Sequence, residues 1–396
     1  MKTGMLSAHF KGFGMKRLSA VETDPYTSNQ HEFNGVSSYK KVFGLDKMEL
    51  PATFLFLSDT EDKCQSESGT ITWYDARENH PTRSEYRLYY SSSTVMPRAQ
   101  SGDLCIVALQ QDDTALVLIA DEGSSIEAQL IWLFGVESSM ETGVLVADEV
   151  SMDAIEITEQ TRRILEEIGI DTWVEDGDVD VEPMLKHFNG GWPTTTAMSE
   201  YARRLAGQEI TVADSDGAIR RWFEMEERLF RAYERVLVES RVRSGFSTVD
   251  DFTAYALSVL NRRKSRAGHA LENHIEHVFQ KLHVPYVRNG KTEQNKRPDF
   301  IFPGIEEYHQ AAHPYSHLRM LAVKTSCKDR WRQILNEADR ITVKHLLTLD
   351  RVLSVNQLNE MSNASVVLVS PYGLTSGSAS GPVVSLKIAE FLALVG

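Results

Sequence analysis

The first third of the chain is a succession of short apolar segments, and helical spacing is rare there. Five of these segments have the length and the β-branched or aromatic content of strands, at residues 53–57, 70–74, 85–90, 104–109 and 115–119. The polar stretch 110–113 between the last two fits a hairpin turn. Short strands at this spacing are typical of a barrel or a sandwich. We therefore expect residues 1–145 to form a β-barrel domain.

The pattern changes to helical spacing over residues 197–242. A further helix is expected to begin with Ser247 or Thr248 as its N-cap, and an apolar stripe from Leu271 to Leu282 predicts another. Apolar runs then predict four strands and a closing helix, at residues 300–302, 320–323, 345–349, 364–370 and 385–394. Strands combined with helices indicate an α/β core, which we assign to residues 196–396.

An acidic connector is expected between the two domains, over residues 146–195. Residues 158–168 have the pattern of a helix there, and the Gly-Gly-Trp-Pro sequence ending at Pro193 predicts a break near the boundary. The segment from Asp121 to Lys186 holds 18 Asp and Glu against 3 Lys and Arg. We expect this acidic stretch to be a solvated linker, or else to compete with an anionic ligand for a basic cleft.

Composition is ordinary for a globular protein of two domains, with 396 residues of which 42% are hydrophobic and 25% charged. The sequence has neither an apolar run long enough to span a membrane nor a signal peptide, and its three cysteines lie far apart. We therefore expect a cytoplasmic protein without a membrane partner. The net charge of −14 disfavours nucleic acid, but from Arg262 to Lys344 the chain has 16 Lys and Arg against 9 Asp and Glu. A basic region of this kind suits DNA.

The chemistry is concentrated between Pro298 and Glu337. Asp299 precedes the predicted strand 300–302, Lys324 follows the predicted strand 320–323, and apolar residues at helical spacing from Trp331 predict a helix that carries Glu337. Magnesium sites take one or two carboxylates together with substrate phosphate, and phosphodiester hydrolysis also needs a cation near the phosphate. Asp299 and Glu337 are the expected Mg²⁺ ligands, and Lys324 is the expected cation.

This arrangement resembles the PD-(D/E)XK nucleases, with one departure. Their pattern places an acid two residues before the lysine, where this chain has Ala322, so the second acid would come from Glu337. The migrated arrangement is similar to that of the EcoRII-type restriction endonucleases. The resemblance is carried by residues 261–268, by Pro298-Asp299-Phe300 and, almost without a gap, by residues 318–339. It covers nearly the whole chain and is weaker before Arg262.

The resemblance implies a type IIE restriction endonuclease that cuts both strands at a short palindrome such as CCWGG, with Mg²⁺ as cofactor. It implies an N-terminal B3-like barrel that binds a second, effector copy of the site and inhibits the catalytic domain. A homodimer is implied, because a palindrome is read by two-fold symmetry. A cognate cytosine methyltransferase would act on the same site without needing to bind. Glu272, on the helix before Asp299, is the implied third acid of the catalytic site.

Several residues are expected to contact DNA. Four positive charges within residues 262–266 suit phosphate or base contacts, and the triplet 328–330 resembles one that reads outer C·G pairs. Trp222 is a possible platform for an extruded base, although a core position is the commoner one for a tryptophan in an amphipathic helix. The expected contacts in the catalytic domain are Arg262, Arg263, Lys264, Arg266, Lys328, Asp329, Arg330 and Trp222. Two basic and polar clusters supply those of the effector domain, namely Lys16, Arg17 and His31, then Arg77, Arg83, Glu85 and Arg87.

Two alternatives stay open. A DNA-binding regulator that has lost cleavage is suggested by Ala322, and the intact set of Asp299, Lys324 and Glu337 argues against it. A structure-specific repair nuclease of the same fold is the other, and a base-reading triplet argues against that one. His274 and His277 lack a spacing typical of metal ligands and are expected at the surface.

Overall fold

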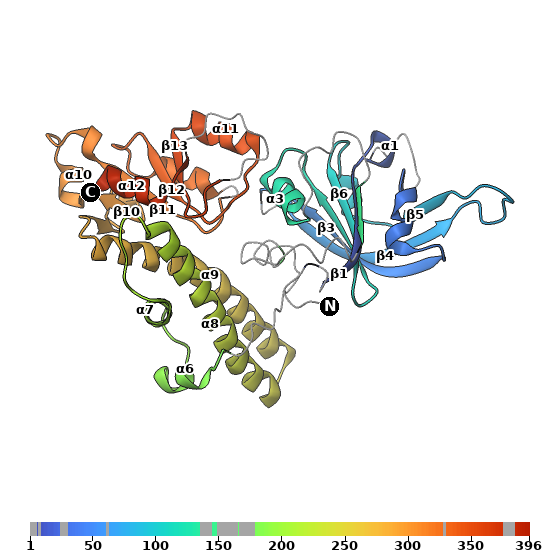
Figure 1. Cartoon of the computed structure of the whole chain (residues 1–396), viewed down its shortest axis with the longest axis horizontal. Coiled ribbons are helices and arrows are strands. Elements are labelled where there is room, and N and C mark those ends of the chain that lie inside the picture. Colours follow the sequence, from blue (N-terminus) through green and yellow to red (C-terminus); the bar gives the residue numbers. More distant parts are fainter. Residues whose placement is uncertain are drawn as a thin grey trace. The chain divides into compact units, whose positions relative to one another are not determined.

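The computed structural model describes residues 6, 9–23, 31–60, 63–134, 145–148, 165, 179–327, 330–374 and 385–396. The chain divides into two compact units (Figure 1). The N-terminal unit comprises residues 1–175 with the short segments 352–357 and 376–380, and the C-terminal unit comprises the rest. Within the described part, no helix is both long enough and apolar enough to cross a membrane.

The N-terminal unit is built on one eight-stranded sheet in the order β2-β5-β4-β3-β7-β6-β1-β8. Its strands are β1 (Phe10–Arg17), β2 (Glu32–Phe33), β3 (Met48–Leu57), β4 (Gln65–Asp75), β5 (Tyr86–Tyr90), β6 (Leu104–Gln110), β7 (Ala115–Ala120) and β8 (Leu145–Asp148). Its helices are α1 (Ala20–Thr23), α2 (Lys40–Phe43) and α3 (Ser125–Leu133), with 3₁₀ turns η2 (Ser37–Tyr39) and η4 (Met96–Arg98). All five predicted strands are confirmed.

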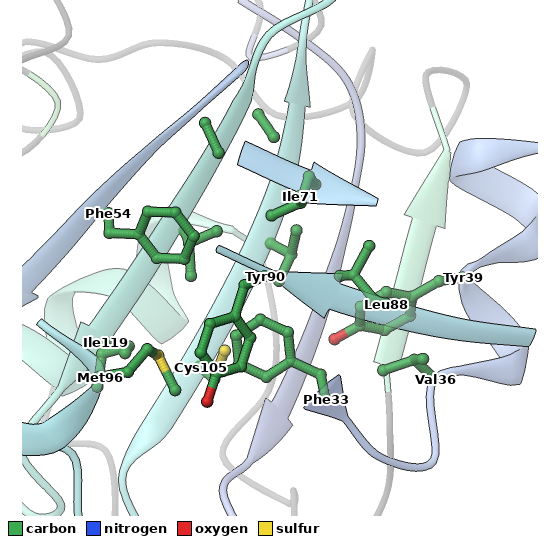
Figure 2. Close-up of a cluster of buried hydrophobic side chains, with 14 of the residues drawn as sticks. Phe33, Val36, Tyr39, Phe54, Ile71, Leu88, Tyr90, Met96, Cys105 and Ile119 are labelled. Carbon is green, nitrogen blue, oxygen red and sulfur yellow. The ribbon is translucent and has the colours of Figure 1, made fainter. Parts of the chain in front are cut away.

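Strands β6 and β7 form the predicted hairpin and are buried on both faces, which explains their unbroken apolar sequence. Alternate residues enter two separate cores. Cys105, Val107 and Ile119 face the core drawn in Figure 2, where the Phe33 and Tyr90 rings lie 4.9 Å apart. The intervening residues of β6 and β7 pack on the other side against α3.

The sheet is curled, but the predicted barrel is not confirmed. Strand order is linear, with β2 and β8 at its two ends. Lys16 on β1 nevertheless reaches the residue after β2, donating to the carbonyl of Asn34 at 2.5 Å. The curl also brings Gly14 of β1 against Tyr39, and a Cβ on this glycine would lie only 2.1 Å from the tyrosine ring. Side chains rather than a backbone ladder therefore link these parts of the sheet.

The C-terminal unit combines a six-stranded sheet in the order β14-β13-β12-β11-β10-β9 with long helices. The strands are β9 (Val287–Arg288), β10 (Phe300–Phe302), β11 (Arg319–Val323), β12 (Lys344–Leu347), β13 (Val366–Val369) and β14 (Ser385–Leu386). The helices are α6 (Glu182–His187), α7 (Thr195–Ala206), α8 (Ser215–Ser244), α9 (Val249–Lys281), α10 (Ile305–His309), α12 (Ile388–Val395) and, from residue 358 onward, α11 (Val355–Asn363). Three 3₁₀ turns complete the unit, at η5 (Glu293–Asn295), η6 (Tyr315–His317) and η7 (Arg330–Asn336).

This sheet is mixed, and the expected α/β core is confirmed. Strands β9, β10 and β11 pair antiparallel, whereas β11 to β14 run parallel. One face packs against α8, α9 and α12 through a core that includes Trp222, Phe279, Phe300 and Phe391. Helices α8 and α9 lie side by side (Figure 1). Thr248 caps α9 as predicted, but the helix runs unbroken for 33 residues where we expected two helices.

Candidate active site

Asp299 and Lys324 meet where β10 and β11 lie next to each other. Phe300 pairs with Leu321 across the two strands, so the residue before β10 lies beside the end of β11. The Asp299 carboxylate accepts from the backbone N–H of Val323 at 2.7 Å and from the Lys324 ammonium at 3.0 Å. Lys324 is fixed in turn by its own N–H, which donates to Leu347 O on β12 at 2.9 Å. The sheet therefore fixes the positions of Asp299 and Lys324, and both side chains are only 17% exposed.

Glu337 enters the same electrostatic environment from the segment after β11. The predicted helix is present only as the 3₁₀ turn η7, which ends at Asn336, so Glu337 lies just beyond it rather than on it. Burial, and then the negative charge of Asp299, raise the pKa of Glu337 to about 7, with Lys324 acting in the opposite direction. The three residues expected to form the catalytic set thus interact with one another.

The donor chemistry of this site suits a hard divalent cation. Asp299 and Glu337 offer carboxylate oxygens, and the charge of Asp299 raises the cost of ionising Glu337, which a cation would relieve. Across the described residues, no group of three or more His, Cys, Asp or Glu side chains gathers as a ready metal site. Two carboxylates with water and substrate phosphate meet the ordinary needs of Mg²⁺. The pair therefore fits the metal, with substrate completing its coordination.

Glu272, the expected third acid, is held in a different interaction. Its carboxylate bonds to the Arg288 guanidinium at 2.7 Å, and Arg288 also pairs with Glu276 at 2.6 Å. His269 lies 3.8 Å from the same Glu272 oxygen. Because Arg288 belongs to β9, next to β10, Glu272 braces the edge of the sheet that carries Asp299. Its role at the metal stays a prediction.

The arginines of the 262–266 cluster do not form an open basic surface. Arg266 is buried and pairs with Glu227 and, at 3.5 Å, with Glu226, while Arg263 pairs with Glu234 at 2.6 Å. The sequence of α9 alone does not reveal that α8 places carboxylates opposite these arginines. The expected contact of Arg266 with DNA is therefore not supported in this structure, and that of Arg263 stays a prediction.

Arg262, in the same cluster, lies over the Trp192 ring at 3.8 Å. Lys264 lies on α9, and its side chain is outside the described part.

Trp222 is a core residue without an exposed face. Its side chain is fully buried, and its indole N–H donates to Gly207 O at 2.7 Å. A base cannot stack on it here, so the expectation of a platform is not met. His274 is also buried, between Glu226 at 3.0 Å and Arg203 at 3.2 Å, which corrects the surface position expected for it.

The candidate base-reading triplet lies mostly outside the described residues. Lys328 and Asp329 belong to this undescribed part, whereas Arg330 opens η7 and is exposed. Just before the triplet, the backbone N–H of Cys327 donates to the buried carboxylate of Asp350 at 2.7 Å.

In the N-terminal unit, the first basic cluster is largely internal. Lys16 is 7% exposed and its ammonium donates to Glu22 at 2.6 Å. Arg17 pairs with Glu127 and donates to Gly102 O at 3.1 Å. The His31 ring stacks on that of Tyr90 at 5.4 Å. Burial makes Lys16 a structural cation in this conformation, so its expected contact with DNA is not supported.

The second cluster is accessible and forms a network. Glu85 bonds to Arg77 at 2.6 Å and to Arg87 at 2.8 Å, and Arg87 also reaches Glu32 at 3.1 Å. Hydrogen bonds from Arg87 and Arg77 lower the pKa of Glu85. Arg83 is exposed and lies three residues before β5 begins.

The chain is similar in sequence to proteins of known activity. A family model described as EcoRII C terminal matches residues 230–381. The type II restriction enzyme EcoRII of Escherichia coli is 32% identical over 328 residues, which cover 82% of this chain and 78% of that protein.

Two solved structures are similar to this chain, with low TM-scores. Metal-depleted Ecl18kI in complex with uncleaved, modified DNA has 19% identity and a TM-score of 0.40, covering 54% of this chain and 81% of that one. A PspGI–substrate DNA complex has 16% identity and a TM-score of 0.37, covering 45% and 76%.

Proposed function

The chain belongs to the EcoRII family of type II restriction enzymes, and on that premise we propose that it makes Mg²⁺-dependent double-strand cuts at a short palindrome resembling CCWGG. As a member of this family it is a DNA nuclease. The observation that carries the proposal is the contact of Asp299 with Lys324 at the end of β11, with Glu337 near enough for the charges of both residues to act on its pKa. Ala322, at the position where related nucleases have an acid, is fully buried, so Glu337 takes that part.

In this proposal Asp299 and Glu337 hold the metal, and Lys324 stabilises charge at the scissile phosphate. Mg²⁺, when bound, supplies further stabilisation of the negative charge that develops on the phosphate. The Asp299 carboxylate keeps the Lys324 ammonium in place through their 3.0 Å contact. Because the N–H of Val323 donates to that same carboxylate oxygen, the other oxygen stays available to the metal.

Recognition is assigned to two surfaces. In the C-terminal unit, Lys328, Asp329 and Arg330 read outer C·G pairs, with cations on guanine and the carboxylate on cytosine. In the N-terminal unit, the network of Arg77, Glu85 and Arg87, with Arg83 nearby, binds an effector copy of the site. We also propose that a homodimer acts on the palindrome and that the N-terminal unit inhibits cleavage. Deleting residues 1–190 should then raise activity, and unchanged or lower activity would count against inhibition.

The test is cleavage of a plasmid that carries several CCWGG sites, with Mg²⁺ present. Wild type should give discrete fragments with ends that map to one sequence, and Lys324→Ala should give none. Lys281→Ala, at an exposed lysine that ends α9, is the matched control and should cut like wild type. No cleavage by wild type or by the truncated chain would favour a binding-only regulator. A smear without bands would favour a structure-specific nuclease.

A further inference from the structure

The turn that presents Glu337 is held from outside by side chains. Regular structure ends at Asn336, and Ala338 has a φ of 50°, in the left-handed region that non-glycine residues rarely adopt. The Lys344 ammonium donates to the backbone carbonyl of Glu337 and, at 2.7 Å, to that of Ala338. One side chain therefore bonds two successive peptide groups of the turn.

The neighbouring peptide groups are held in the same way. Lys296 donates to Asn336 O at 2.5 Å, and Asp339 N donates to the Glu293 carboxylate at 3.2 Å. Lys296 lies three residues before Asp299, so the segment leading to one expected metal ligand is tied to the turn that carries the other.

Lys344 differs from Lys296 in being almost completely enclosed. It is 4% exposed and occupies the first position of β12, with its own N–H bonded to Ser365 O at 3.0 Å. Burying an ammonium is costly, and an apolar residue of similar size is often at least as stabilising. Stability alone therefore does not account for a lysine here. Its two carbonyl partners point instead to a function in fixing Glu337.

We propose that Lys344 is a positioning residue, which fixes the backbone of Glu337 and thereby sets the affinity of the site for its divalent cation. This rests on the proposed function, in which Glu337 is a metal ligand. Lys344 acts through the peptide carbonyls and touches neither metal nor DNA. Groups that orient metal ligands typically contribute about 10- to 100-fold in metal affinity or activity.

The experiment measures binding of Mn²⁺ alone to the full chain, by electron paramagnetic resonance of the free ion. Lys344→Met removes the ammonium group, and with it both hydrogen bonds to the turn, while keeping an unbranched side chain. The Kd for Mn²⁺ should rise about tenfold or more, while affinity for a CCWGG duplex in EDTA stays as in wild type. Lys281→Met is the matched control and should change neither value. A merely structural role would lower the folded fraction, seen by circular dichroism, without changing the Kd of the folded molecules.

An unchanged Mn²⁺ Kd in folded Lys344→Met would overturn the proposal. If that variant does not fold, Lys344→Arg and Lys296→Met decide, since the first keeps a donor and the second alters only an exposed contact. Both variants should bind Mn²⁺ more weakly than wild type, Lys296→Met by the smaller factor, and wild-type affinity in both would again overturn the proposal. Asp299→Asn distinguishes failure of this proposal from failure of the proposed function. If Asp299→Asn binds Mn²⁺ as tightly as wild type, the proposed metal site itself is contradicted.

Discussion

Glu337 is expected to destabilise the metal-free fold at alkaline pH. Its pKa is raised from 4.5 to about 7 by burial and by the charge of Asp299. Between these two values the folded chain holds a proton that the unfolded chain has released. Folding stability is therefore highest below the unfolded pKa, and it decreases as the pH rises through the window to about 7.

The size of the effect follows from the shift. A change of this extent corresponds to roughly 3 kcal/mol when it is converted in full. Glu337 keeps contact with solvent, so screening lowers the expected contribution to about 1–2 kcal/mol. Glu337→Gln is neutral at every pH and should remove this penalty. The variant should be more stable than wild type by about 1–2 kcal/mol at pH 8.5 and equally stable at pH 4.5, although it should not cut DNA.

The assay is urea denaturation of both chains in EDTA at pH 4.5, 6 and 8.5, followed by tryptophan fluorescence. Glu306→Gln, at an exposed acid on α10, is the control and should show no such trend. Saturating Mg²⁺ should reverse the order at pH 8.5, because only wild type gains binding energy from the metal. A stability difference that is the same at all three pH values, or a less stable variant at pH 8.5, would refute the reasoning.

Three further results are expected. Trp222→Ala should lower the free energy of unfolding by about 3–5 kcal/mol by opening a core cavity; a variant of wild-type stability with a specific defect in DNA binding would contradict the core assignment. Arg266→Ala should cost about 3–5 kcal/mol because it leaves Glu226 and Glu227 buried without this cation; a change confined to the salt dependence of DNA affinity would instead make Arg266 a DNA contact. Arg87→Ala, on the accessible network, should weaken binding of an effector duplex and lower the slope of log affinity against log salt concentration by about one. Fluorescence anisotropy measures both, with Lys11→Ala as the control, and equal affinities of the two variants would remove this network from the interface.

The local pattern of apolar and polar residues was sufficient to predict strands whose side chains are all buried or alternate strictly between buried and exposed. The run from Leu104 to Leu109 predicted a strand because both of its faces are buried, and Phe300–Phe302 did so because a break follows it. It was also sufficient to pair Asp299 with Lys324, since both lie at strand ends. Two helices were expected over the range of α9, one beginning at Ser247 or Thr248 and one carrying the stripe from Leu271 to Leu282. The basic residues between them instead belong to one continuous helix, where carboxylates of α8 pair with Arg263 and Arg266.

Side-chain contacts with the backbone of a neighbouring turn were the part that pattern missed. Lys344 carries no local signal beyond being a charge at the start of an apolar strand, and only the fold shows its bonds to the Glu337 turn. The 3₁₀ form of η7 was likewise hidden, because apolar residues three apart suit either kind of helix.

The central claim is that Asp299, Lys324 and Glu337 form one cleavage site. Single-turnover cleavage of a CCWGG duplex by Asp299→Asn, Lys324→Ala, Glu337→Gln and the pairwise combinations tests it most directly, with duplex binding measured in parallel in EDTA. Residues that act as a unit are non-additive, so each single change should abolish nearly all cleavage and the second should cost little more, with binding retained. Full cleavage by any one single variant, or losses that multiply independently, would contradict the account.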